Sequence, residues 1–111
     1  MKLFCVVPAT WVPGGGGAPP DGLPAFQSFF TACPGDATRA LMVVDFGEHH
    51  GAEDAWRATP GMIVLPELWE WGSRLVPPAA VTLFGAWGVL ATDTMGQAAL
   101  KIRAVWPHFR H

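Results

Sequence analysis

Hydrophobic positions along the chain fall into short runs that are separated by glycine and proline. Residues 2–8 are apolar and rich in β-branched side chains, a pattern typical of a strand. Residues 39–46 form the clearest run, and a continuous apolar stretch of this kind indicates a strand covered on both faces, as in parallel sheets. Residues 62–65 predict a third, shorter strand that stops before Pro66.

Helical spacing alternates with these strands. Across residues 24–33 the apolar positions recur at i, i+3, i+4 and i+7, the spacing of one helical face: Phe26, Phe29, Phe30 and Cys33. Residues 52–58 predict a short helix, because Glu53 and Asp54 lie in its first turn, where the helix dipole favours negative charge. Residues 67–76 fit neither period, and we interpret them as an irregular, partly exposed segment.

The end of the chain predicts two helices joined by a tight turn. The first starts at Pro78 and runs to about Trp87, with Gly88 as its left-handed cap. The second is capped by Thr92 or Asp93 and runs to Val105. Together they form a C-terminal helical hairpin.

This order of elements predicts an α/β fold with a small, three-stranded, mostly parallel βαβαβ core followed by the helical hairpin. The alternative is an α+β fold with a mixed sheet, because the second crossover is short for a parallel connection. The length fits a single domain over residues 1–111. Residues 12–22 are rich in glycine and proline and predict a flexible loop.

The amino-acid composition indicates how the protein associates with other molecules. Half of the residues are hydrophobic, 14% are charged and the mean hydropathy is +0.27, which excludes a disordered chain. Ordinary domains carry about 25% charged residues, so this small domain has little polar surface and should expose an apolar patch. Trp56, Trp87 and Trp106 fall at helix positions that can face the core.

The other tryptophans are candidates for that exposed patch. Trp11, Trp69 and Trp71 lie in segments bounded by glycine and proline, and exposed tryptophan is typical of binding hot spots. The leading interpretation is therefore a non-catalytic protein-interaction or homo-oligomerising module that uses these three residues. Its partner is a second copy or another protein, and it needs no cofactor.

A second interpretation is a small ligand- or metal-binding protein, with an enzyme as one form of it. Asp45, Glu48, His49 and His50 combine carboxylates and imidazoles, which can hold a divalent metal or exchange protons. Against it, adjacent histidines point in different directions, and Asp45 can instead tie the turn that follows its strand. We do not expect an enzyme, because the chain has no G-x-S-x-G nucleophile elbow and its glycine run lacks the lysine of a phosphate-binding loop.

A third interpretation is a nucleic-acid contact through the last helix, whose hairpin resembles a helix-turn-helix in outline. Thr94, Gln97 and Lys101 would face the groove. Asp93 in the first turn and a net charge of −2 argue against it, because phosphate binding needs a broad positive field.

The two cysteines and the length of the apolar tracts bear on the cellular location of the protein. Cys5 and Cys33 both lie in apolar runs, which favours buried free thiols over a disulfide. The apolar tract 75–91 is broken by prolines and glycines and falls short of the roughly 20 residues that cross a bilayer. We therefore expect no membrane association and a cytoplasmic protein.

Overall fold

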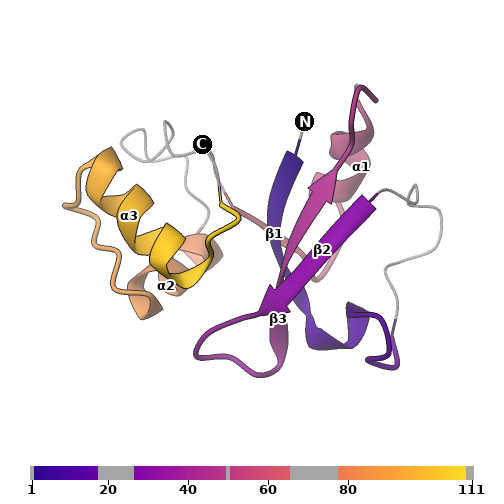
Figure 1. Ribbon diagram of the computed structural model, residues 1–111, viewed down its shortest axis with the longest axis horizontal. Helices are drawn as coiled ribbons and strands as arrows, with labels where there is room; N and C mark the ends of the chain where they lie inside the picture. Colours follow the sequence, from indigo (N-terminus) through magenta and orange to yellow (C-terminus); the bar gives the residue numbers. More distant parts are fainter. Residues whose placement is uncertain (1, 18–26, 50, 66–77, 110–111) are drawn as a thin grey trace. The chain divides into compact units, whose positions relative to one another are not determined.

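The computed structural model describes residues 2–17, 27–49, 51–65 and 78–109. The chain divides into two compact units, Met1–Val64 and Leu65–His111. The first holds the β-sheet and one short α-helix, and the second holds two α-helices (Figure 1). Cooperative unfolding of the whole chain as a single domain stays a prediction.

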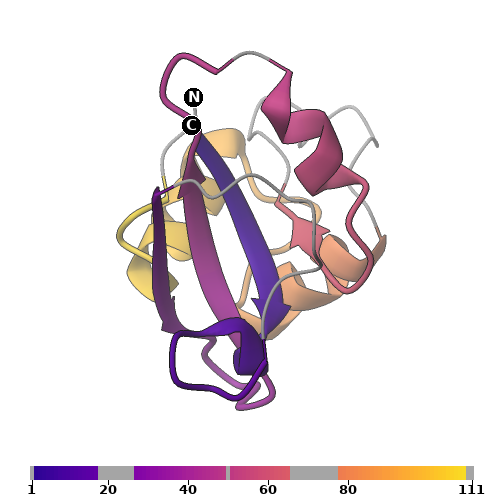
Figure 2. The ribbon, with the colours of Figure 1, turned by 90° about the vertical axis from the view of Figure 1, so that its right-hand side faces the viewer.

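The sheet has four strands in the order β2-β3-β1-β4, and all of its pairs are antiparallel. The strands are β1 Lys2–Pro8, β2 Gln27–Ala32, β3 Arg39–Asp45 and β4 Ile63–Val64. Figure 2 shows β3 between β1 and β2. The predicted parallel βαβαβ core is therefore wrong, although the strands predicted at 2–8, 39–46 and 62–65 are confirmed.

The helix predicted over residues 24–33 is also wrong, because residues 27–32 form β2. Phe29 and Phe30 fit a helical stripe, but in a strand they simply point to opposite faces. Phenylalanine and threonine favour strands, and pairing along β3 outweighs a short helical pattern.

Because residues 27–32 form a strand and not a crossover helix, the neighbouring strands β2 and β3 run antiparallel. Residues 33–38 connect β2 directly to β3, in a turn that Asp36 holds by accepting hydrogen bonds at its Oδ1 from Thr38 N (2.9 Å) and Thr38 Oγ1 (2.5 Å). Parallel pairing needs a crossover of about a dozen residues or more. A six-residue connection can only produce an antiparallel hairpin.

One face of the sheet carries the hydrophobic core of the first unit. The helix α1, Ala52–Arg57, confirms the helix predicted at 52–58 and places Trp56 on this core. The Trp56 and Phe46 rings meet edge to face, with centroids 6.2 Å apart. The buried members of the cluster are Leu3, Cys5, Val7, Ala40, Met42, Val44, Phe46 and Trp56.

A short 3-10 helix, η1, spans Ala9–Trp11 and folds the chain back after β1. The glycine run begins here in an ordered turn, because Gly17 N donates to the Thr10 carbonyl at 2.8 Å. A Cβ atom on Gly15 would lie 2.8 Å from the Ala9 carbonyl oxygen. Glycine is therefore required at this position for steric reasons. Residues 18–22 of the predicted loop lie outside the described residues.

In the second unit the two helices predicted at the end of the chain are confirmed as α2, Pro78–Ala86, and α3, Met95–Val105. Gly88 has φ +81° and lets Val89 N donate to the Phe84 carbonyl (2.8 Å), which is the expected left-handed cap. The cap of α3 is Thr94, not Thr92 or Asp93. Among the described residues, neither of these helices nor α1 has the length and apolar content needed to cross a membrane.

Candidate functional site

The predicted tryptophan surface is only partly visible in the structure. Trp11 ends η1 and is half-buried, because its side chain packs against the core cluster of the sheet. Trp69 and Trp71 lie outside the described residues. Trp56 and Trp106 are buried, as predicted for core tryptophans.

The structure points instead to β2, which the sequence pattern assigned to a helix. Within the described part of the sheet β2 has β3 as its one neighbour, so it is an edge strand. No residue of Gln27–Ala32 is charged, and the Phe29 side chain is 50% exposed. An edge strand presents a row of backbone N–H and C=O groups that a further strand can pair with.

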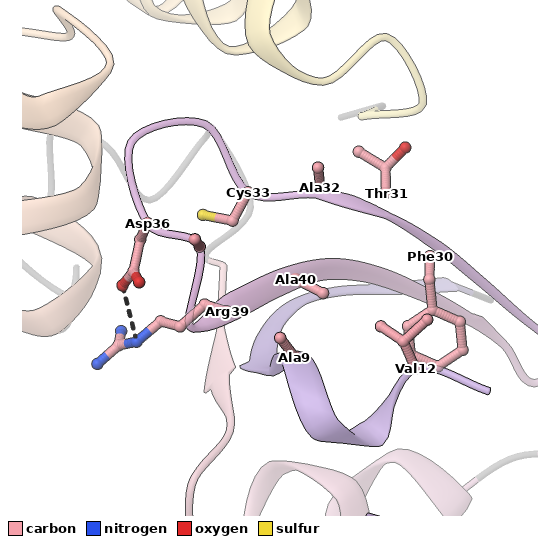
Figure 3. A pocket seen from close by; sticks show the side chains of 10 residues that line it. Ala9, Val12, Phe30, Thr31, Ala32, Cys33, Asp36, Arg39 and Ala40 are labelled. Atoms are coloured by element: carbon pink, nitrogen blue, oxygen red, sulfur yellow. Dashed lines mark ion pairs between the residues drawn. The ribbon is translucent and has the colours of Figure 1, made fainter. Parts of the chain in front are cut away.

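A cavity of about 430 Å³ lies beside the C-terminal half of β2 (Figure 3). It is formed where η1, the β2–β3 turn and the ends of both strands meet. Its lining is largely apolar, so it suits an aliphatic or aromatic group. The residues that line it are Ala9, Val12, Phe30, Thr31, Ala32, Cys33, Asp36, Ala37, Arg39 and Ala40.

The polar groups of this pocket are already paired or neutral. Arg39 Nε lies 3.4 Å from Asp36 Oδ2, an ion pair drawn in Figure 3. Burial, together with the negative charge of Asp36, raises the pKa of the Cys33 thiol. The largely apolar lining therefore suits the binding of an apolar group.

The acidic and histidine cluster does not form a metal site within the described residues. Asp45 Oδ1 accepts a hydrogen bond from Gly47 N at 2.9 Å, so this carboxylate ties the turn after β3. Glu48 and His49 are exposed, and His50 lies outside the described residues. The part of the chain that the structure describes contains no group of three metal-ligating side chains.

The polar residues proposed to read nucleic acid have structural partners at the start of α3. Thr94 Oγ1 accepts from Gln97 N (3.2 Å), while Gln97 Oε1 accepts from Thr94 N (2.9 Å), forming a capping box. Lys101 Nζ lies 2.7 Å from Asp93 Oδ2. These contacts give Thr94, Gln97 and Lys101 local structural roles within the second unit.

Both cysteines are buried free thiols, as predicted. Burial raises the pKa of Cys5 from 9.0 to about 12, and the positive charge of Arg57 offsets this only in part. The thiol is neutral in both the folded and the unfolded chain below pH 9. Above pH 9 it ionises only when unfolded, so protons bind more tightly to the folded state and stability falls as pH rises towards 12.

We therefore expect the free energy of unfolding to drop between pH 9 and 11 by on the order of 1 kcal/mol per pH unit from this group. Urea denaturation at a series of pH values measures it. Cys5→Ala is the control, because the lysines titrate equally in both proteins. Parallel pH profiles for the two proteins would contradict the assignment to Cys5.

Comparison with known proteins gives no relative from which a function could be transferred. No protein-family description matches the chain, and no curated protein or solved structure is significantly similar to it.

Proposed function

We propose that this protein is a non-catalytic interaction module that self-associates through β2. The observation that carries the proposal is an uncharged edge strand with a half-exposed phenylalanine, Phe29. Such a strand presents backbone groups at the edge of the sheet beside apolar side chains. Sheet extension by a second strand satisfies both at once.

The contrast with β4 supports this choice of strand. Natural proteins protect sheet edges by making them short or by placing lysine or proline on them. β4, at the other edge, has two residues, Ile63–Val64. β2 has six residues, with neither a proline nor a charge. It therefore lacks the composition-based protection that such edges usually carry.

Charge also favours a second copy as the partner. Two identical strands bring identical residues together, so any charge on β2 would meet a like charge nearby. β2 has none, and the net charge of the whole chain is only −2. Electrostatic repulsion between copies is therefore small. The two unbridged cysteines fit a reducing compartment, which supports a cytoplasmic location.

Native mass spectrometry of the untagged protein without chelator, together with light scattering over a concentration series, tests the proposal. We expect a dimer or higher assembly without bound metal, with a mass that rises with concentration. A monomer at all concentrations would contradict the proposal. A monomer that carries one stoichiometric ion would redirect attention to Asp45, Glu48, His49 and His50.

A further inference from the structure

We propose that the cavity beside β2 binds a small amphipathic acid, with its apolar body against Phe30 and Val12 and its carboxylate at the Arg39 guanidinium. The cavity lies within a single copy of the chain, so this inference goes beyond the proposed self-association and does not depend on it. Its volume of about 430 Å³ falls in the range of roughly 300–1,000 Å³ that is usual for small-molecule sites.

The walls of this cavity are held in place by contacts within the first unit. Phe30 and Val12 are partly buried and pack against the core cluster of the sheet, which fixes them as one wall of the cavity. The helix η1 is tied to the β2–β3 turn, because Ala9 N donates to the Thr38 carbonyl at 2.9 Å. A cavity with anchored walls is already formed before a ligand arrives, which lowers the cost of binding.

The two ends of the cavity differ in chemistry. Figure 3 shows Phe30 and Val12 at one end and the Asp36–Arg39 ion pair at the other, with Ala40 between them. An aromatic or aliphatic group suits the first end, and a polar or charged head group suits the second. The ligand that matches both ends is therefore amphipathic.

The hydrogen-bonding groups at the polar end favour an anionic head group. Asp36 Oδ1 accepts hydrogen bonds from the Thr38 N–H and hydroxyl groups, and Oδ2 is paired with Arg39. Arg39 carries several N–H donors, and its pair with Asp36 is made through Nε, at 3.4 Å. Its terminal amino groups can therefore donate to a ligand carboxylate in the bidentate geometry that arginine favours.

The neighbouring charges set how much the head group contributes. Burial, and then the charge of Asp36, raises the pKa of the Cys33 thiol, so the thiol is neutral near neutral pH and does not repel an acid. The Asp36 carboxylate opposes a bound anion in part, and the Arg39 side chain is 42% exposed. An ion pair in such a setting is weak. We therefore expect the apolar body to supply most of the affinity and the carboxylate to supply the selectivity.

NMR of the protein labelled at its alanine methyl groups, titrated with phenylpropionate, tests the inference. A bound phenyl ring should shift the methyl signals of the alanines that line the cavity and leave that of Ala55, on α1, unchanged. The neutral phenylpropionamide should bind about fivefold more weakly, and the cation phenylpropylamine more weakly still. The alanines that line the cavity are Ala9, Ala32, Ala37 and Ala40.

Substitutions at the two kinds of wall separate the head group from the apolar body. Arg39→Gln should weaken the binding of phenylpropionate about fivefold and leave that of the amide unchanged. Arg57→Gln on α1 is the matched control, because Arg57 is also exposed, carries the same charge and lies outside the cavity. Ala9→Leu should weaken both probes about tenfold, because its larger side chain takes up apolar space in the cavity.

The outcomes are distinct whether the protein is a monomer or a dimer. Shifts at the cavity alanines, with a preference for the acid that Arg39→Gln removes, support the inference. Equal affinities for the acid and the amide, or an unchanged affinity in Arg39→Gln, overturn the carboxylate site. Shifts confined to alanines outside the cavity, or no binding of any probe, overturn the cavity as a ligand site.

Discussion

Phe29→Lys is expected to raise the dissociation constant of the dimer by about 30-fold. Phe29 is half-exposed in the single chain, and complete burial of a phenylalanine is worth roughly 1.5–3 kcal/mol. Burying the remaining half contributes ~1 kcal/mol in each copy, or ~2 kcal/mol for the pair. Each 1.4 kcal/mol changes the dissociation constant about tenfold. Lysine is also the residue that natural edge strands use against pairing.

Sedimentation velocity over a concentration series measures the effect, and circular dichroism verifies that the variant keeps its sheet. Val81→Lys is the matched control, because Val81 on α2 is 48% exposed, close to the value for Phe29. Equal weakening by both variants would show that general apolar surface, and not β2, drives association. No weakening by either would remove β2 from the interface.

Trp56→Ala is expected to lower the free energy of unfolding by about 3–5 kcal/mol. Trp56 is 4% exposed, packs in the core cluster of the sheet and meets the Phe46 ring edge to face. The substitution removes the largest side chain that α1 contributes and leaves a cavity. Since domains are stable by only about 5–15 kcal/mol, this single change removes a large fraction of the total.

Comparison of Trp56→Phe with Trp56→Ala separates the effect of aromatic ring packing on stability from the effect of the indole N–H group. The Trp56 Nε1 atom is buried and has no hydrogen-bond partner among the described residues. Phenylalanine keeps an aromatic ring and removes that unpaired donor, so we expect a loss of less than about 1.5 kcal/mol. Urea denaturation of both variants measures the difference. Equal losses would show that the indole nitrogen has a partner, such as a buried water.

Local patterns in the sequence predicted most elements but not the way they pair. The strand at 39–46 and the helix at 52–58 were identified because each has one dominant signal, a continuous apolar run or acids in the first turn. Residues 24–33 carried two signals. Phe26, Phe29, Phe30 and Cys33 fit a helical stripe, while the same phenylalanines fit the two faces of a strand.

The assignment of residues 24–33 to a helix led to the wrong prediction of parallel strand pairing. A helix between β1 and β3 would have acted as a crossover and made parallel pairing reasonable. A strand joined to β3 by residues 33–38 makes the pair antiparallel. Strand partners are set by contacts between distant segments, which short-range periodicity does not report.

The candidate site was missed for the same reason. An exposed apolar surface was predicted from composition and assigned to tryptophans, of which Trp11 is half-buried. The edge position of β2 exists only once the order of the strands is known. The signal available in the sequence was the absence of charge and proline from Gln27–Ala32, a stretch that contains two phenylalanines and one threonine.

The order β2-β3-β1-β4 also has a consequence for the kinetics of folding. β2 and β3 are joined by a short turn, and a hairpin of this kind forms in about 1–10 μs. β1 reaches its place beside β3 only after a much longer loop has closed, so its docking is the slower event. Closing that loop costs only about 0.6 kcal/mol more for each doubling of its length. Insertions placed after the ordered turn that ends at Gly17 should therefore delay the arrival of the first strand while leaving the equilibrium almost unchanged.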